Sequence, residues 1–516
     1  MRDDGEVSNA RSTPVVVAGV VAGLAGVAVS QVLTAVLGVR VSPVVAVAEA
    51  IIELTPGPVA EVLISIVGTW DKPLLVGGVV LGVLALVALA GVLARRSVGL
   101  GNAVLLLMAA IALAALLSRP GFNAVSVIPL AAGVATWMVV LALLSDRAEL
   151  AYADDGDPGP AVSDGSRRSF LLLAGATAVV SLAAVAGTQL LGRGRRAVET
   201  SRRLLRLSAG RGAVPDGAEL DLPGLSPWRV PNEEFYRIDT ALVVPAVDPS
   251  DWRLRIHGLV DQELDLTYAD LLERERTEAW VTLCCVSNEV GGDLVGNAYW
   301  SGVRIADLLA EAGVAPDADA VKQTSQDGWT CGTPLAALTD GRDAMLALAM
   351  NGEPLPLEHG FPVRMVVPGL YGFVSATKWL VDLEVTRFDD FTAYWTERGW
   401  SEQGPVKTQS RIEVPDNGDD VPAGRVRVGG HAWAQHTGVE KVEVRLDGNA
   451  WATAELGRVP SDDTWVQWAI TVEMAPGPHT LAVRATDRSG YTQTAALADV
   501  VPDGATGWHT IAVEAG

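Results

Sequence analysis

The chain has 516 residues, of which 49% are hydrophobic, and its formal net charge is −22. This acidity excludes nucleic acid as a partner, because binding to phosphates requires a basic surface. The hydrophobic content is high for a soluble protein, so we expect part of the chain to lie in a membrane. Three cysteines are too few for a disulfide framework in a chain of this length, so a cysteine in a functional site is the simpler explanation.

Five uncharged apolar runs occupy most of the first 200 residues. Each is long enough to cross a hydrocarbon core of ~30 Å as a helix. Residues 41–70 are also apolar, but their prolines and three carboxylates (Glu49, Glu53 and Glu61) favour short amphipathic helices at the outer interface over a sixth crossing. We expect the spans at about residues 14–39, 73–94, 97–118, 120–145 and 169–192.

Basic residues beside the spans predict the orientation. Arg2 and Arg11 precede the first span, and Arg95-Arg96 join the second to the third, which places the N-terminus in the cytoplasm. Everything after Gly192 then lies outside the cell, although arginines that follow the fifth span oppose this orientation.

The histidines bear on electron transfer, because a transmembrane b-type haem is held by axial side chains, usually His. All six histidines occur from His257 onward. We therefore expect no haem in this chain and interpret the helices as an anchor or as a docking surface for another subunit.

Residues 281–288 read Val-Thr-Leu-Cys-Cys-Val-Ser-Asn, a hydrophobic strand that ends in an Asn- and Gly-rich turn. This pattern presents a soft thiolate at the mouth of a pocket. Together with the Trp-x-Gly-Val-x-Ile-x-Asp-Leu-Leu that begins at Trp300, it resembles the molybdenum site of the sulfite oxidase family. The resemblance implies that Cys285 is the one protein sulfur on the metal and the catalytic cysteine. Cys284 then points to the opposite face of the strand, since side chains alternate with a period of 2.

The resemblance covers roughly residues 225 to 516 and implies a bound molybdenum-molybdopterin. A pterin with a phosphate tail needs Arg, Lys and loop N–H groups for the anion, and His and Asp suit the edge of the ring. Taken singly, each such residue has an ordinary alternative, such as Lys378-Trp379 as a surface pair. By resemblance, the cofactor-binding residues are Arg237, Asn288, Asp327, His359, Arg364, Ser375 and Lys378.

The family's chemistry implies an oxidoreductase that performs two-electron oxygen-atom transfer on a small, sulfur-containing substrate. Sulfite-oxidising members carry an Arg after the cysteine motif where this chain has Glu289, and a Tyr where it has Leu348. If both line the pocket, they disfavour sulfite, so reduction of an S- or N-oxide such as methionine sulfoxide is an alternative. A cofactor-free envelope binding or assembly protein is an alternative of another class, which Cys285 opposes.

A cofactor domain outside the cell must be loaded before export. Residues 166–171, Ser-Arg-Arg-Ser-Phe-Leu, resemble a twin-arginine signal, which serves such domains, although two ordinary cytoplasmic arginines beside a span are the alternative. The expected location is therefore the cell membrane, as a multi-pass protein with an extracytoplasmic catalytic domain. Its partners would be a separate electron carrier (a cytochrome or a quinone-linked subunit) and a small-molecule substrate.

Short alternating strands with turns such as Asp447-Gly448-Asn449 follow residue 400 and predict an Ig-like sandwich. In the family such a domain mediates dimers, so a homodimer is implied by resemblance. The basic segment after the fifth span is either a stem at the membrane surface or a linker helix packed on the domain. The expected fold is a transmembrane α-helical bundle (1–197), a stem or linker (198–224), a mixed α+β sulfite-oxidase-like molybdopterin domain (225–395) and the all-β sandwich (400–516).

Overall fold

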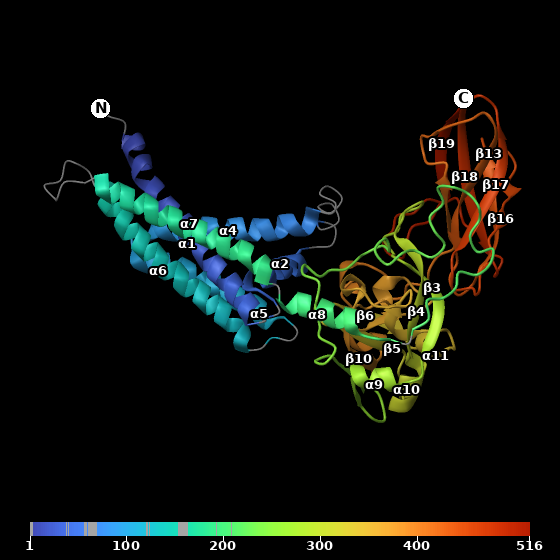
Figure 1. The fold of residues 1–516 in the computed structure, drawn as a ribbon, viewed down its shortest axis with the longest axis horizontal. Coiled ribbons are helices and arrows are strands. Elements are labelled where there is room, and N and C mark those ends of the chain that lie inside the picture. Colours follow the sequence, from blue (N-terminus) through green and yellow to red (C-terminus); the bar gives the residue numbers. More distant parts are fainter. Residues whose placement is uncertain are drawn as a thin grey trace. The chain divides into compact units, whose positions relative to one another are not determined.

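The computed structural model describes residues 4–37, 39, 41–55, 59, 70–119, 122, 124–152, 164–191, 193–207 and 209–516. Arg2, Pro56, Pro58, Glu61 and Gly192 lie outside these residues. The chain divides into two compact units, residues 1–197 and residues 198–516 (Figure 1). The first unit is helical, and the second combines a mixed α+β region with a C-terminal region of strands.

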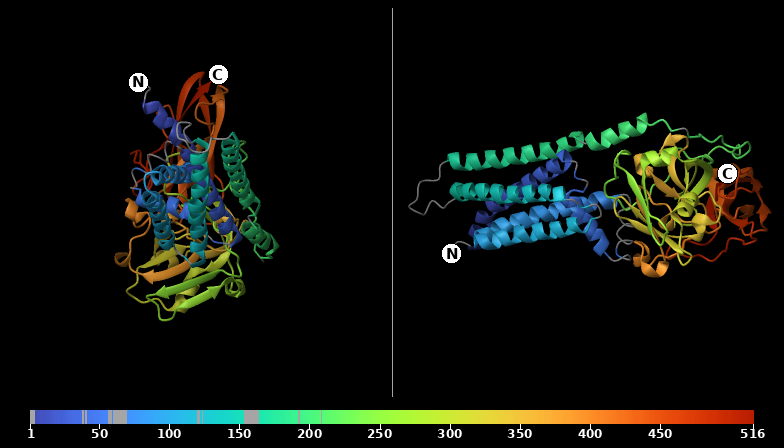
Figure 2. Two further views of the ribbon diagram at one scale, coloured as in Figure 1. Left: turned by 90° about the vertical axis from the view of Figure 1, so that its left-hand side faces the viewer. Right: turned by 90° about the horizontal axis from the view of Figure 1, so that it is seen from below.

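The first unit contains five described helices that are long and apolar enough to span a membrane. Figure 2 shows the helices of this unit lying side by side. The shorter α2 has 12 residues and begins after Ser42, whose hydroxyl accepts a hydrogen bond from the Val45 N–H, so a short helix does lie where an interface segment was expected. The helices are α1 (Asp4–Val36), α2 (Pro43–Leu54), α4 (Asp71–Ala94), α5 (Val98–Leu117), α6 (Val127–Tyr152) and α7 (Asp164–Leu191).

Glycines let α1 approach its neighbours closely. A Cβ on Gly19 would lie 2.4 Å from the Ala88 Cα of α4, and one on Gly26 would lie 2.1 Å from the Trp137 ring of α6. Trp137 Nε1 donates to the Gly23 carbonyl at 3.2 Å. Such small residues are typical of helix contacts in a membrane, where close van der Waals packing and interhelical hydrogen bonds drive association.

Helix α8 (Arg193–Leu204) crosses the boundary between the units. From Val198 onward the segment packs on the second unit, because Val198 is buried in its core and Leu205 and Leu207 lie against that core. Arg202 also donates to the Pro354 carbonyl at 3.0 Å. Of the two expectations for this segment, the structure favours the packed linker helix over the stem on a membrane surface.

Two sheets and three short helices form the mixed region. Thr267 caps α9 (Tyr268–Glu273) in a capping box with Asp270, which confirms the predicted N-cap. Strand β1 pairs with β10 in parallel, and the other pairs are antiparallel. One sheet has the order β2 (Leu264–Thr267), β1 (Arg253–Gly258), β10 (Leu380–Thr386), β5 (Ala320–Ser325) and β6 (Thr330–Pro334). The other has the order β3 (Thr277–Cys284), β4 (Val295–Arg304), β7 (Met345–Met350) and β8 (Glu353–Pro354), with β9 (Arg364–Val366) also paired to β7, and the remaining helices are α10 (Ile305–Ala312) and α11 (Ala336–Thr339).

Strand β7 lies in the centre of the core. It reads Met-Leu-Ala-Leu-Ala-Met, and all of its residues are buried. A continuous apolar run of this length indicates a strand that is covered on both faces. Leu348, in the middle of this strand, has no exposed surface and cannot line an open pocket. Leu348 was expected to disfavour sulfite only if it lined the pocket, and the structure does not meet that condition.

The C-terminal β region consists of two sheets with a shared core. Val428 and Trp468 of the first sheet pack with Val442, Leu481 and Ile511 of the second. The first sheet has the order β11 (Gln409–Val414), β13 (Gly424–Trp433), β17 (Val466–Met474) and β16 (Glu455–Leu456). The second has the order β12 (Asp420–Val421), β19 (His509–Ala515), β18 (Gly477–Asp487), β14 (Val439–Leu446) and β15 (Ala452–Thr453).

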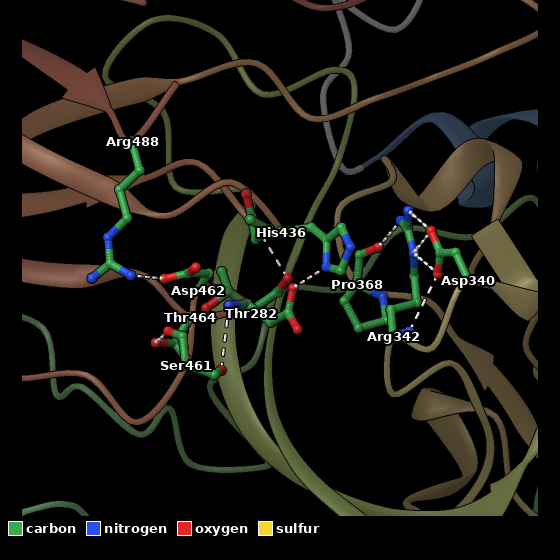
Figure 3. A network of polar contacts seen from close by, with 11 residues as sticks. Thr282, Asp340, Arg342, Pro368, His436, Ser461, Asp462, Thr464 and Arg488 are labelled. Carbon is green, nitrogen blue, oxygen red and sulfur yellow. Dashed lines mark hydrogen bonds and ion pairs between the residues drawn. The ribbon is translucent and has the colours of Figure 1, made fainter. Parts of the chain in front are cut away.

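Polar contacts join strand β3 to the C-terminal β region (Figure 3). The Thr282 N–H donates to the Asp463 carbonyl at 2.9 Å, and the Trp465 N–H donates to Thr282 Oγ1 at 2.8 Å. At the same junction, His436 Nδ1 lies 3.1 Å from Asp463 Oδ1. The strand that leads to Cys285 is therefore held by residues from both regions of the second unit.

Candidate functional site

Cys285 follows β3 directly and begins the loop that returns to β4. We call residues 285–294 the cysteine loop. The Cys285 N–H donates to the Leu294 carbonyl at 2.9 Å, and the Cys285 carbonyl accepts from the Asn288 N–H at 3.1 Å. Asn288 Oδ1 accepts the Leu294 N–H at 2.8 Å. The backbone and side chain of Asn288 thus hold the two ends of the loop together. The contact of Asn288 with a cofactor stays a prediction.

The two adjacent thiols have different surroundings. Burial raises the pKa of Cys285, while hydrogen bonds from Ser287 and the charge of Lys378 lower it. Burial and then Cys285 raise the pKa of Cys284 well above its usual range, while Arg411 lowers it. The cation that acts on each thiol is different, which fits the expected alternation along the strand and places Cys285 on the side of Lys378.

A tight turn brings the next residues together. Gly360 has φ +108°, and a Cβ there would lie 2.9 Å from the Arg364 Cβ and 3.1 Å from the Lys378 Cα. Only glycine fits this position without strain. The Met365 N–H donates to the Thr377 carbonyl at 2.9 Å, so Arg364 and Lys378 leave neighbouring segments of the chain.

Three neighbouring cations, Arg237, Arg364 and Lys378, lie on the Cys285 side of the site, and two of them pair with one carboxylate. Asp239 Oδ2 lies 3.2 Å from Lys378 Nζ and 3.0 Å from Arg237 Nε. The buried Arg364 donates to the carbonyls of His359, Met365 and Ala376. In residues 209–516, all of which are described, Asp239 is the only carboxylate that forms an ion pair with these cations. The cluster therefore keeps a net positive charge.

Such a charge is costly in a buried place unless an anion neutralises it. Burial lowers the pKa of Lys378 to about 8 and that of Arg364 to about 10. Both values show that the chain by itself stabilises these charges poorly. A phosphate group would supply the missing negative charge and accept hydrogen bonds from both residues.

His359 is buried within the same cluster and presents an acceptor without a partner. Its Nε2 lies 2.9 Å from the Asn232 carbonyl and must donate there, so in the neutral ring Nδ1 is the acceptor. Burial and then the charges of Lys378 and Arg364 lower the pKa of His359 to about 3, which keeps the ring neutral. Nδ1 is buried and has no hydrogen-bond partner among the described residues. This orphaned atom fits an N–H or O–H donor from a bound pterin.

Asp327 and Ser375 are placed less directly. Asp327 lies half-buried in the turn after β5, and this turn adjoins the cluster because the Gln326 N–H donates to the Trp379 carbonyl at 2.8 Å. Ser375 is completely buried, and its hydroxyl donates to the Tyr371 carbonyl at 2.9 Å. The Ser375 side chain therefore has a partner within the chain, and a role for it or for Asp327 in cofactor binding stays a prediction.

The structure adds Tyr236 to the predicted site. Burial raises the pKa of Tyr236 well above its usual range, followed by the charges of Cys285 and Cys284, while Arg364 lowers it. The phenol thus lies near the thiols and Arg364, keeps its proton and can donate a hydrogen bond. Its ring stacks on Phe235, with centroids 5.2 Å apart. Of this leading segment, only Arg237 was expected at the site from the sequence, and Tyr236 and Asp239 were missed.

Comparison with known proteins identifies related chains. Residues 241–395 match the family described as the oxidoreductase molybdopterin binding domain. This range includes Cys285 and the His359–Lys378 block, whereas Tyr236, Arg237 and Asp239 lie just before it.

Three relatives extend this match. Sulfite oxidase of Gallus gallus is 29% identical over 321 residues, which are 52% of this chain and 69% of that protein. Mitochondrial sulfite oxidase of Homo sapiens is 31% identical over 300 residues, which are 49% of this chain and 54% of that protein. The uncharacterized oxidoreductase YuiH of Bacillus subtilis (strain 168) is 36% identical over 157 residues, which are 30% of this chain and 76% of that protein.

The chain spans about half the length of the mammalian relatives that it matches. The range that matches the family model contains the cysteine loop together with His359, Arg364 and Lys378. By its sequence, this chain belongs to the sulfite oxidase family of molybdopterin oxidoreductases.

Proposed function

We propose that this chain binds molybdenum-molybdopterin and catalyses two-electron oxygen-atom transfer with a small, sulfur-containing substrate. The observation that carries the proposal is the position of Cys285 beside a buried cluster of net positive charge that holds an unpartnered histidine nitrogen. When bound, the cofactor supplies a metal that cycles by two electrons and an oxygen atom that is exchanged with the substrate.

The residues of the chain have distinct roles in this proposal. Cys285 Sγ is the metal ligand, and the hydrogen bonds of the cysteine loop fix its position. Arg364 and Lys378 bind the phosphate tail, with Arg237 at the more exposed edge. His359 Nδ1 accepts a hydrogen bond from the cofactor. Asn288, Asp327 and Ser375 are assigned to the cofactor by family resemblance alone.

Tyr236 contributes differently, because it carries no charge. A tyrosine hydroxyl is protonated at neutral pH, and the raised pKa of Tyr236 extends this to alkaline pH, so it can donate a hydrogen bond in the space near Cys285. The hydroxyl then orients an oxygen atom of the substrate without adding a charge to the site.

One observation favours reduction of a neutral S- or N-oxide over oxidation of sulfite. The charged residues of the cysteine loop are Glu289 and Asp293, and both are exposed. Two exposed carboxylates on the loop that begins at Cys285 disfavour the approach of a sulfite dianion, whereas they tolerate a neutral oxide such as a methionine sulfoxide. Both half-reactions can be assayed with artificial electron donors and acceptors, and turnover of sulfite alone would exclude the reductase.

Cofactor content tests the proposal directly. We expect purified wild-type protein to contain molybdenum and a pterin that fluoresces after oxidation. Cys285→Ser should lose activity while it remains folded, and Cys284→Ser is the matched control that removes the neighbouring thiol. A wild-type protein without metal and without pterin would instead support the cofactor-free envelope protein.

We also propose that the chain is a multi-pass membrane protein with its catalytic part on the extracytoplasmic side. Five helices are long and apolar enough to span. With the N-terminus inside, the segment after α1 and the end of α5 lie on the same outer side. An ion pair fits their being on the same side, in either orientation of the bundle, because Glu49 Oε2 lies 3.6 Å from Arg119 Nη1 in the first unit. Residues 166–171 serve as the twin-arginine signal in this proposal.

Cysteine labelling in intact cells tests the orientation, because all three native cysteines are buried. Glu473→Cys introduces a thiol at a side chain that is 74% exposed in the C-terminal β region. A membrane-impermeant maleimide should label it. Arg96→Cys, between α4 and α5, is the matched control and should react only after lysis. Labelling of Arg96→Cys alone in intact cells would contradict the proposed orientation.

The electron carrier in this proposal is a separate cytochrome or quinone-linked subunit. The C-terminal β region is proposed as an Ig-like sandwich that forms a homodimer, as the family resemblance implies. Sedimentation of the purified protein in detergent tests the dimer. A haem spectrum from the purified single chain would contradict the separate carrier.

A further inference from the structure

The cysteine loop contacts the C-terminal β region at its tip. Gly291 has φ +81°, and a Cβ there would lie 2.3 Å from His509 Cδ2 of β19. Arg411 of β11 donates from Nη1 to the Gly292 carbonyl at 2.8 Å. This bond joins residues that are 119 positions apart in the sequence. The loop that carries the proposed metal ligand therefore ends against a different region of the fold.

Arg411 is held rigidly behind this contact. Its Nε donates to Glu413 Oε1 at 2.6 Å, and only 8% of its side chain is exposed. Glu413 Oε1 also lies 2.8 Å from His431 Nδ1, and Glu413 Oε2 accepts the Ser226 N–H at 2.8 Å. A guanidinium with a buried, fully occupied carboxylate partner has one preferred orientation. The orientation of the Arg411 guanidinium is thus fixed by residues outside the cysteine loop.

The hydrogen bond from Arg411 to the Gly292 carbonyl lies at the tip of the cysteine loop, where few other hydrogen bonds hold the backbone. The Gly292 N–H donates to the Glu289 carbonyl at 2.9 Å, which is a contact within the loop tip itself. Asn288 and the Cys285–Leu294 bond restrain the base of the loop. The guanidinium of Arg411 donates the charge-assisted hydrogen bond that ties the tip to the β region.

We infer that Arg411 is a positioning residue that clamps the cysteine loop through the Gly292 carbonyl, so that the C-terminal β region sets the position of Cys285 Sγ. The consequence for catalysis rests on the proposed function. The clamp itself is a property of the loop and has a readout that does not depend on turnover. The active site is in this view built from both regions of the second unit.

The experiment compares Arg411→Met and Arg411→Lys in the full-length holoenzyme. Methionine keeps much of the apolar stem but cannot donate, whereas lysine can still donate to Gly292 and pair with Glu413. Hydrogen exchange measures the protection of peptides that span residues 285–294. We expect about 10- to 100-fold faster exchange in this loop for Arg411→Met, and partial recovery for Arg411→Lys.

Two further readouts separate positioning from a general structural role. The electron paramagnetic resonance signal of the reduced metal should become heterogeneous in Arg411→Met, and kcat should fall more than KM rises. The matched control is Arg427→Met, because the exposed Arg427 also donates to a backbone carbonyl, that of Asp221, but lies away from the loop. We expect Arg427→Met to leave loop protection and the signal unchanged.

Two results would overturn the inference. The first is loop protection in Arg411→Met equal to that of wild type. The second is loss of protection throughout the C-terminal β region, which would make Arg411 an ordinary core residue. A wild-type chain that lacks molybdenum would refute the proposed function, yet the exchange comparison would still decide whether the clamp exists.

Discussion

Arg364→Met separates a cofactor-binding arginine from a structural one, because the two roles predict opposite effects on stability. Burial lowers the pKa of Arg364 from its ordinary 12.5 to about 10. Without cofactor, the folded chain therefore disfavours the charged guanidinium by ~3 kcal/mol relative to water. Removal of the charge relieves this cost, but it also removes three long hydrogen bonds to carbonyls, at 3.3, 3.4 and 3.5 Å, worth about 1 kcal/mol each. These effects nearly cancel.

The cofactor changes the balance. In the variant, a bound phosphate loses its charge-assisted hydrogen bond from Arg364. Such a bond contributes about 1.5–3 kcal/mol to binding, so the affinity for the cofactor should fall roughly 10- to 100-fold. We therefore expect Arg364→Met to unfold at nearly the wild-type denaturant concentration when both are made in a cofactor-deficient host. From a competent host, the variant should retain less molybdenum and pterin after dialysis.

Arg342→Met is the matched control. Arg342 pairs with Asp340 and donates to the Pro368 carbonyl at 2.7 Å, in the network of Figure 3 and outside the cation cluster. Arg342→Met should lower the free energy of unfolding of the chain without any change in cofactor content. The reasoning would be refuted if Arg364→Met strongly destabilised the cofactor-free chain and yet retained the cofactor as wild type does.

Three other predictions concern charge and hydrogen bonding. Burial lowers the pKa of Lys378 from 10.5 to about 8, so between these values the unfolded chain binds more protons than the folded chain. The free energy of unfolding of cofactor-free protein should rise with pH in this window, by ~2 kcal/mol between pH 8 and 9.5 relative to Lys378→Met, and a flat difference in denaturant titrations would disprove it. Thr282→Val should cost about 1–3 kcal/mol for each of the two partners that it leaves unpaired, Asn297 Oδ1 at 3.0 Å and the Trp465 N–H at 2.8 Å. An unchanged melting temperature would show that β3 does not need this junction. Glu289→Arg should lower KM for sulfite and leave KM for a neutral sulfoxide unchanged in steady-state assays, because it removes a repulsive charge from the cysteine loop. Equal effects on both substrates would place Glu289 away from the substrate.

Local patterns in the sequence predicted much of the fold. The cap at Thr267 is confirmed, since a threonine three residues before an acidic residue specifies a helix start within one turn. The apolar runs before residue 200 form the long helices, and these could also be predicted locally, because length and composition alone identify a helix that can span a membrane. The cysteine and the His359–Lys378 block were recognisable because their residue types and spacing together form a motif.

Long-range contacts account for what the sequence did not predict. Leu348 was considered as a pocket residue because sulfite-oxidising members of the family have a Tyr at its position, but the uninterrupted apolar run of β7 indicates a strand that is buried on both faces. Tyr236 and Asp239 lie in a leading segment of irregular structure, where neither periodicity nor turn chemistry shows which side chains point inward. The bond between Arg411 and Gly292 depends on how two regions pack, and no local pattern reports it.

X-ray absorption at the molybdenum edge tests the central claim most directly. The account predicts that Cys285→Ser protein has one sulfur fewer around the metal than wild type, while the Cys284→Ser control keeps the wild-type count. Equal sulfur counts in wild type and Cys285→Ser, or loss of the sulfur in Cys284→Ser, would contradict the assignment of Cys285 as the metal ligand.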